Sequence, residues 1–225
     1  MRLLVTGTDT EIGKTLVTCS LLQALNSRGL RSIGMKPIAA GVNAHGTWDD
    51  VERIREASPV AAAIEHIAPY RLRAWASPHF AAREDGVTIE EEVVLAALGH
   101  LERLAALVVI EGAGGFRVPL SERLDSAGLA AALGAPVVMV VPMRLGCINH
   151  ALLTAEAIAG RALTLLGWVA NAGIDPGYSR IGQTADTITD RLQAPCIGTL
   201  PRLTLGQSGA GHLNIDPILP RLRMS

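Results

Sequence analysis

Residues 7–15 read GTDTEIGKT and lie between an apolar run, LLVT at 3–6, and a helix-period segment, VTCSLLQAL at 17–25. A glycine-rich turn between a strand and a helix lets backbone N–H groups point at a phosphate chain, aided by the positive end of the helix dipole. The spacing x-x-x-x-G-K-T fits such a loop, although the usual leading glycine is displaced by one position, to Gly7. The stretch therefore predicts a nucleotide-phosphate site, the alternative being an ordinary strand-to-helix turn.

Further apolar runs rich in β-branched residues alternate with helix-period segments along the rest of the chain. They are SIGMK (32–36), LVVIE (107–111), PVVMVV (136–141), LLGWVAN (165–171) and CIGTL (196–200). Continuously apolar runs separated by helices indicate parallel strands that are buried on both faces. We predict an α/β fold with one ATP-binding domain over residues 1–225: a doubly wound, mainly parallel sheet with flanking helices.

Local signals place some helix boundaries. Thr88 and Glu91 have the T-x-x-E spacing of a capping box, which predicts a helix from residue 88. Asp125 is expected to cap DSAGLAAAL (125–133) before Gly134. The segment from about 67 to 87 mixes proline, glycine and charges, and we expect a long surface connection there.

The composition argues against several classes of partner. The net charge is −1 with a pI near 6.6, so no basic surface for nucleic acid or anionic lipid is expected. The longest apolar run, about 135–143, is too short to span a bilayer, and the first strand begins directly after Met1. Three widely separated cysteines lack metal-site spacing. We therefore expect a reduced, cytoplasmic protein with no nucleic-acid or membrane partner.

Polar residues at strand ends extend the predicted site. In an α/β sheet, ligands bind beyond the carboxyl ends of the strands. Glu111 ends one buried strand and needs a partner, either Mg²⁺ held near phosphates or a salt bridge. Asp50 is a further oxygen ligand or simply a helix cap. Lys36 is expected to end the second strand, before Pro37.

Lysine usage singles out two positions. Of 20 basic residues only Lys14 and Lys36 are lysines, and a compact ammonium suits a crowded phosphate site. Chance or biased codon usage is the alternative. In the loop, Lys14 is expected to reach the outer phosphates and the Thr15 hydroxyl to ligate magnesium. Two lysines and a divalent ion around one triphosphate suggest phosphoryl transfer.

Several segments together resemble the ATP-dependent dethiobiotin synthetase family over nearly the whole chain. They are GTDTEIGKT, KPIAAG (36–41), Asp50, ASPH (76–79), VVIEGAGG (108–115), LGCINHALLTA (145–155), GWVAN (167–171) and IGTLP (197–201). The resemblance implies a homodimeric, P-loop NTPase-like cyclo-ligase of biotin biosynthesis. Its substrates are 7,8-diaminononanoate (diaminopelargonate) and CO₂, its cofactors are ATP and Mg²⁺, and its products are dethiobiotin, ADP and phosphate.

The resemblance also implies residue roles. Lys36, Lys14 and Thr10 form the catalytic set, and Thr15, Asp50 and Glu111 the magnesium set. The nucleotide is assigned to Thr10, Glu11, Ile12, Gly13, Lys14, Thr15, Leu16, Asp50, Glu111, Asn171 and Pro201, with Asn171 and Pro201 near the adenine. The substrate is assigned to Lys36, Ala40, Gly41, Gly146, Cys147, Ile148 and Asn149, the last four offered across the dimer interface to its carboxylate. Ordinary turn or capping roles are the alternatives for Asn171 and for GCINHA.

One position departs from the family pattern. The family commonly has serine in K-P-[VI]-A-S-G, whereas this chain has Ala40. A hydroxyl that could bind substrate or phosphate is therefore missing, and backbone N–H groups of Ala40 and Gly41 or water are candidates to replace it. The property in doubt is substrate affinity.

Other classes fit less well. Partitioning or division-site ATPase switches carry a signature lysine five residues before the loop lysine, where this chain has Asp9. They often end in a basic amphipathic helix, whereas Pro217 and Pro220 interrupt this tail, PILPRLRMS. A GTPase N-K-x-D motif is missing, because Ala172 follows Asn171. A relative that ligates a different carboxylate remains a closer alternative.

Overall fold

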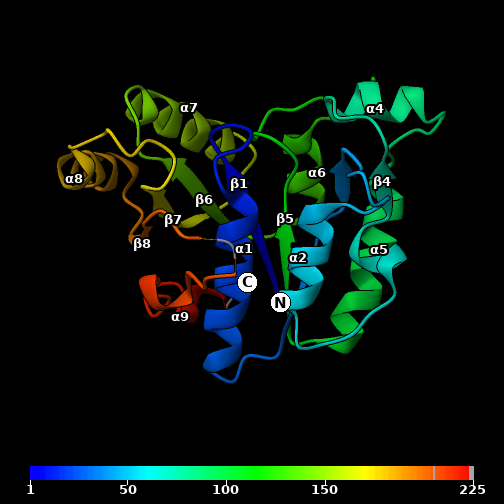
Figure 1. Ribbon diagram of the computed structural model, residues 1–225, viewed down its shortest axis with the longest axis horizontal. Coiled ribbons are helices and arrows are strands. Elements are labelled where there is room, and N and C mark those ends of the chain that lie inside the picture. Colours follow the sequence, from blue (N-terminus) through cyan, green and yellow to red (C-terminus); the bar gives the residue numbers. More distant parts are fainter. Residues whose placement is uncertain (205, 223–225) are drawn as a thin grey trace.

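The structure is a computed structural model that describes residues 1–204 and 206–222, so the last three residues of the proline-containing tail lie outside it. A six-stranded sheet in the order β2-β5-β1-β6-β7-β8 forms the centre, and each neighbouring pair is parallel (Figure 1). The strands are β1 Arg2–Gly7, β2 Ser32–Met35, β5 Leu107–Glu111, β6 Val137–Pro142, β7 Leu165–Asn171 and β8 Cys196–Leu200. The predicted doubly wound α/β sheet is confirmed, with strand bounds within a residue or two.

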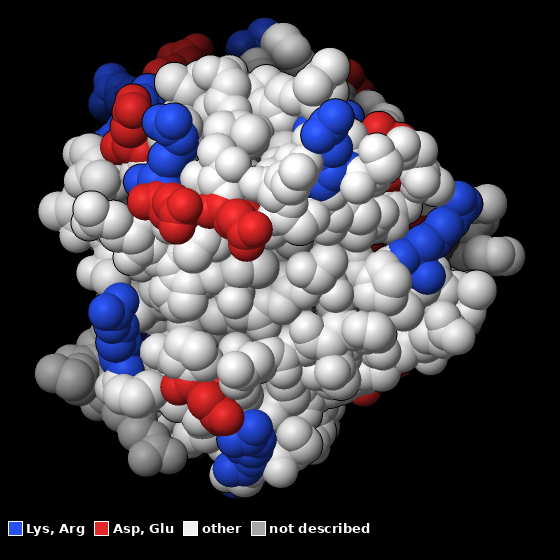
Figure 2. All heavy atoms as spheres, turned by 90° about the vertical axis from the view of Figure 1, so that its left-hand side faces the viewer, with Lys and Arg blue, Asp and Glu red and all other residues white. Residues whose placement is uncertain are grey.

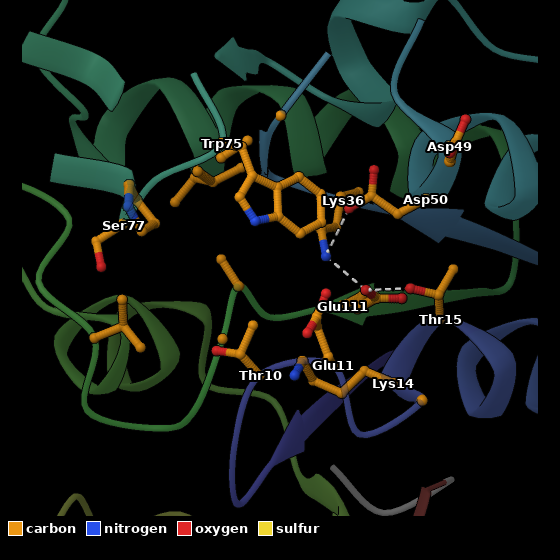
Figure 3. Close-up of a pocket in the computed structure, with 18 of the residues that line it drawn as sticks. Thr10, Glu11, Lys14, Thr15, Lys36, Asp49, Asp50, Trp75, Ser77 and Glu111 are labelled. Carbon is orange, nitrogen blue, oxygen red and sulfur yellow. Dashed lines mark hydrogen bonds and ion pairs between the residues drawn. The ribbon is translucent and has the colours of Figure 1, made fainter. Parts of the chain in front are cut away.

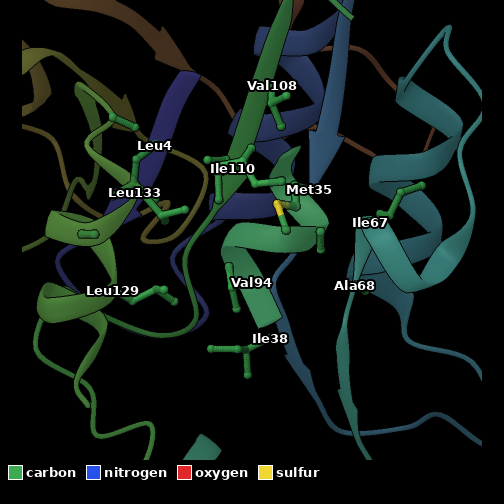
Figure 4. Packing of buried hydrophobic residues seen from close by; sticks show 14 of the residues in the cluster. Leu4, Met35, Ile38, Ile67, Ala68, Val94, Val108, Ile110, Leu129 and Leu133 are labelled. Atoms are coloured by element: carbon green, nitrogen blue, oxygen red, sulfur yellow. The ribbon is translucent and has the colours of Figure 1, made fainter. Parts of the chain in front are cut away.

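Helices cover both faces of this sheet. They are α1 Lys14–Ser27, α2 Asp49–Ala57, α3 Ile64–Ile67, α4 Pro78–Glu84, α5 Glu91–Leu104, α6 Ser126–Leu133, α7 Cys147–Ala159, α8 Ile181–Leu192, the 3₁₀ turn η1 Ala210–His212 and α9 Leu219–Leu222. Alternate residues of β1 enter different clusters: Leu4 packs with α5 and α6 (Figure 4), whereas Leu3 and Val5 pack with α1. Two apolar layers explain why the strands are continuously apolar in sequence.

The segment from 67 to 87 is not the long surface connection that was expected. It contains β4 (Tyr70–Leu72), which pairs in parallel with β3 (Ile38–Ala40), and then the helix α4. Ile67 and Leu72 are each 2% exposed, so the segment contributes to the core. The strand was missed because β4 is only three residues long, too short to show a periodic pattern in this mixed composition. The helix α4 was missed because Pro78 looks like part of a loop in the sequence, whereas proline in the first turn favours the start of a helix.

The two predicted helix caps had different outcomes. Asp125 caps α6 as expected, and its Oδ1 accepts a hydrogen bond from the Gly128 amide at 2.6 Å. The predicted capping box at Thr88 is wrong, since α5 begins at Glu91 after Glu90. The chain stays extended before the helix because Ile89 is buried and the Glu90 amide donates to the Tyr70 hydroxyl at 3.0 Å.

The described part of the chain gives two further facts about organisation. Cys19, Cys147 and Cys196 are free thiols. Within residues 1–204 and 206–222, no helix combines the length and apolar content that crossing a bilayer requires.

Candidate active site

A cavity of about 650 Å³ opens at the carboxyl ends of β1, β2 and β5. The loop after β1, the residues after β2 and β5, the start of α2 and the segment before α4 all line it (Figure 3). Of the residues predicted from sequence, it is lined by Thr10, Glu11, Gly13, Lys14, Thr15, Leu16, Lys36, Ala40, Gly41, Asp50 and Glu111. The fold thus brings most of the predicted catalytic, nucleotide and metal residues to one place.

The glycine-rich loop is fixed from behind by Asn171. Its Nδ2 donates to the Ile12 carbonyl at 2.8 Å, and the side chain is 2% exposed at the end of β7. Gly13 has φ 86°, and a Cβ there would lie 2.3 Å from Asn171 Nδ2. Glycine at 13 is therefore required both by the left-handed backbone and by this contact.

Lys14 reaches back over its own loop. Its Nζ donates to the Asp9 carbonyl at 2.7 Å, while the Asp9 carboxylate pairs with Arg144 at 2.7 Å. Burial, together with the nearby charge of Lys36, lowers the pKa of Lys14 to about 8, against opposing effects of Glu111 and Asp9. The ammonium is thus buried against a carbonyl dipole, and an anion in the cavity would stabilise its charge.

Lys36 lies among carboxylates. Its Nζ is 2.5 Å from Glu111 Oε1 and 3.0 Å from Asp50 Oδ2, and Thr15 Oγ1 donates to the same Glu111 oxygen at 2.9 Å (Figure 3). Burial alone would lower the pKa of Lys36, but the charges of Glu111 and Asp50 outweigh it and raise the pKa. β2 ends at Met35, so Lys36 is the first residue after the strand and not its last.

The predicted magnesium ligands converge. Thr15, Asp50 and Glu111 supply one hydroxyl and two carboxylates, the oxygen donors that Mg²⁺ prefers, and Lys36 holds a positive charge between the two carboxylates. Glu111 Oε2 is buried with no hydrogen-bond partner among residues 1–204 and 206–222. These residues therefore fit Mg²⁺, which usually completes its coordination with waters and phosphate oxygens. Asp50 does not cap α2, whose capping residue is Trp48.

The other predicted residues lie outside this cavity. Ile12 is buried, and Asn171 and Pro201 lie at the ends of neighbouring strands, where Asn171 pairs with Leu200. The four residues assigned to the substrate carboxylate, Gly146, Cys147, Ile148 and Asn149, form the capping residue and first turn of α7. The Cys147 amide already donates to the Arg144 carbonyl at 3.1 Å.

Two expectations about backbone donors are corrected by the hydrogen bonding. The Gly41 N–H was a candidate to replace the missing hydroxyl at Ala40, but it donates to the Leu72 carbonyl at 3.1 Å. Cys147 is 1% exposed, so it is no open donor at the α7 terminus. The Gly41 bond extends the β3–β4 pairing, and the Cys147 bond closes the turn that precedes α7.

Sequence reasoning missed several residues that line the cavity. They are Ile38, Asp49, Arg53, Trp75, Ala76, Pro78, Ala113, Gly114 and Val118, and Ser77 was left without a role. Trp75 is 78% exposed, which is unusual for so large an apolar side chain. A tryptophan directly before the ASPH segment, in a chain with three tryptophans, was the available signal.

Comparisons with known proteins agree with this geometry. A family model described as an AAA domain matches residues 1–207. The chain is 48% identical over 222 residues to the ATP-dependent dethiobiotin synthetase BioD of Ralstonia nicotianae, with 96% of each chain covered. It is also 48% identical over 200 residues to the protein of the same name from Aromatoleum aromaticum, with 88% of each covered.

Solved structures with a similar fold are more distant in sequence. The cell division ATPase MinD of Pyrococcus furiosus matches with a TM-score of 0.62 at 13% identity, over 100% of this chain and 99% of that one. MinD of Pyrococcus horikoshii, complexed with Mg-ADP, matches with a TM-score of 0.57 at 14% identity, over 90% and 82%. At such identities the likeness shows a shared P-loop NTPase fold, whereas the sequence relatives show that the chain belongs to the ATP-dependent dethiobiotin synthetase family, a family of ligases.

Proposed function

We propose that residues 1–225 form a single synthetase domain that converts 7,8-diaminononanoate, CO₂ and ATP into dethiobiotin, ADP and phosphate. The observation that carries the proposal is the convergence of Lys14, Lys36, Thr15, Asp50 and Glu111 on one cavity. Phosphoryl transfer depends mostly on positioning and on stabilising the charge of the migrating group, which this set of residues can supply.

The reaction has three chemical steps. One amine of the substrate takes up CO₂ as a carbamate, and the carbamate oxygen then attacks the γ-phosphate of ATP with loss of ADP. The neighbouring amine attacks the resulting carbamic-phosphoric anhydride, so that phosphate leaves and a five-membered urea closes. Lys36 holds the carbamate and γ-phosphate oxygens, while Lys14, with Thr10 as a helper, and the amides of residues 13–15 hold the phosphate chain.

Thr15, Asp50 and Glu111 are the residues that would hold Mg²⁺ in this site. When bound, the ion would supply positive charge that neutralises phosphate oxygens during phosphoryl transfer. Lys36 now lies between the two carboxylates, so it has to turn from them toward the reacting oxygens as the site fills. Asn171 and Pro201 are the proposed adenine contacts, at the ends of neighbouring strands.

We also propose a cytoplasmic homodimer whose interface completes the substrate site. Gly146, Ile148 and Asn149 would offer the start of α7 to the carboxylate of substrate bound in the partner subunit, whereas the Cys147 amide is already engaged with Arg144. The side of the molecule seen in Figure 2 has a broad area without charged side chains. Leu145, just before α7, and Leu153, on α7, are 89% and 56% exposed, and the proposed interface would cover both.

The test is to incubate purified protein with the diamine, bicarbonate and Mg-ATP and to follow dethiobiotin and phosphate together. We expect equal amounts of both products, and no phosphate without the diamine. Phosphate release that ignores the diamine would instead favour the alternative, an ATPase switch of the partitioning or division-site type. The fold permits that alternative, but Asp9 stands where such switches carry their signature lysine.

A further inference from the structure

The three tryptophans lie in very different surroundings. Trp168 is fully buried, and the indole N–H of the half-buried Trp48 donates to the Leu72 carbonyl at 2.8 Å. Trp75 is 78% exposed and lines the active-site cavity. Single exposed apolar residues are common on proteins, so exposure alone says little; its place in the cavity is the observation that matters.

The Trp75 indole lies against the backbone of the neighbouring segment at Gly41. A Cβ on Gly41 would lie 2.3 Å from Trp75 Cε3, so the ring lies directly against the backbone at Gly41, where φ is +93°. Hydrogen bonds join this backbone to the chain before Trp75, from the Val42 amide to the Arg73 carbonyl at 3.0 Å. The Arg73 guanidinium is in turn 2.7 Å from Asp85. The backbone that leads to Trp75 is therefore tied to the β3–β4 pair, and this places the indole beside Gly41.

Trp75 forms an apolar wall next to the reacting groups. Ile38, Ala40 and Ala76 line the same cavity with side chains that carry no polar atom. In Figure 3 the indole lies on the same side of the pocket as Lys36 and Asp50, opposite Thr10 and Lys14. A ligand that reacts beside Lys36 thus has an exposed aromatic surface within reach.

We propose that Trp75 is a substrate-binding residue that covers the carbon chain of the diamine and thereby sets the preference for long-chain substrates. This inference rests on the proposed function, because that substrate carries two adjacent amines on a chain of methylene groups. An indole buries such a chain efficiently, since it offers a large apolar surface with little conformational freedom to lose. The contact also keeps water away from the carbamate.

The first experiment compares Trp75→Ala with the wild type in steady-state kinetics. We expect the KM for the diamine to rise about tenfold, the effect of losing contact with about two methylene groups, with kcat within about twofold and the KM for ATP unchanged. Trp75→Phe is expected to recover most of the loss. Phe80→Ala is the matched control, because Phe80 is 51% exposed on α4 but does not line the cavity.

The second experiment identifies the part of the substrate that the indole contacts. Titrating the diamine into wild-type protein with Mg²⁺ and a non-hydrolysable ATP analogue is expected to change tryptophan fluorescence, and Trp75→Phe is expected to remove that change. Competitive inhibition by 1,2-diaminopropane, which has the paired amines without the long chain, is expected to be equal in wild type and Trp75→Ala.

Three results would overturn the inference while the proposed function stands. The first is an unchanged KM for the diamine in Trp75→Ala. The second is that Trp75→Ala weakens binding of 1,2-diaminopropane as much as binding of the diamine. The third is that the Trp75→Ala homodimer dissociates at concentrations where the wild-type homodimer does not, because the indole would then act on assembly and not on substrate. Failure of the proposed function gives a different result, because wild-type protein would then form no dethiobiotin from the diamine, bicarbonate and Mg-ATP.

Discussion

The surroundings of Lys14 and Lys36 differ, although both ammonium groups line one cavity and each is less than 10% exposed. Lys14 donates to a backbone carbonyl, and burial lowers its pKa to about 8. Lys36 lies between two carboxylates, which raise its pKa. Among residues 1–204 and 206–222, Lys14 thus makes no direct ion pair, although the charges of Glu111 and Asp9 act on it, whereas Lys36 makes two.

In the proposed mechanism, this difference gives the two lysines different roles, one in binding ATP and the other in the chemical steps. An anion that enters beside Lys14 would give its ammonium a direct ionic partner in place of a backbone carbonyl alone. Lys36, in contrast, would have to leave Asp50 and Glu111 to contact substrate oxygens, and those two carboxylates are among the residues that would hold Mg²⁺. We infer that Lys14 serves mainly to bind ATP and that Lys36 serves mainly the reacting groups.

The largest expected effect follows from removing Lys36. We expect Lys36→Ala to reduce dethiobiotin formation by about 10²- to 10³-fold with ATP binding nearly intact, because the charge is lost at the migrating group. Without ligands the variant should also lose about 3–5 kcal/mol of unfolding free energy, since Glu111 is left buried and unpaired. Turnover and denaturant titration measure the two effects. Unchanged turnover would remove Lys36 from the mechanism.

Replacing Lys14 should have the opposite effect on stability. We expect Lys14→Met to raise the unfolding free energy of the ligand-free protein by about 1–2 kcal/mol at pH 7, because a buried cation close to Lys36 is removed. The same variant should bind ATP much more weakly. Denaturant titration and ATP binding by calorimetry check both parts, with Lys36→Met as the matched control that should lower stability.

Alkaline pH should distinguish the two lysines as well. Because the pKa of Lys14 is lowered to about 8 in the folded protein, the unfolded chain binds the Lys14 proton more tightly than the folded protein does. Between about pH 8 and 10.5 the folded protein has lost this proton and the unfolded chain has not, so the free energy of unfolding rises with pH. Lys36 has the opposite effect, because its pKa is raised in the folded protein. Its charge therefore contributes to the free energy of unfolding below pH 10.5, and this contribution is lost as the pH rises through the pKa of Lys36 in the folded state. ATP affinity should therefore fall above pH 8, by up to about tenfold per pH unit, while ligand-free stability rises.

Lys14→Met provides the control for this pH experiment. Its stability profile should lack the rise between pH 8 and 10.5, whereas Lys36→Met should keep it. Parallel profiles for wild type and Lys14→Met would contradict the lowered pKa.

The loop side of the site could be predicted from sequence because it is contiguous. The spacing of Gly13, Lys14 and Thr15 specifies local backbone geometry, and the end of a continuously apolar strand places Glu111 at the same edge. The six central strands were predictable for the same reason, since burial on both faces leaves an unbroken apolar run.

The substrate side could not be predicted in the same way, because separate segments assemble it. β3 and β4 have three residues each, too short for a periodic signal, and their pairing places Trp75 against Gly41. Likewise, the role of Asn171 behind Gly13 depends on a contact across 159 positions of the chain. Such contacts follow from the tertiary fold, which no local pattern encodes.

The smallest expected effect concerns the substrate side, at Ala40. We expect Ala40→Ser to lower the KM for the diamine by about two- to tenfold, the effect of one net hydrogen bond of about 0.5–1.5 kcal/mol, with the fold and the KM for ATP unchanged. The Gly41 amide is engaged with Leu72 and cannot make this bond instead. Combining the change with Trp75→Ala tests whether hydroxyl and indole act on different parts of the substrate, because independent contacts give additive free energies. An unchanged KM in Ala40→Ser would mean that substrate makes no use of a hydroxyl on this wall.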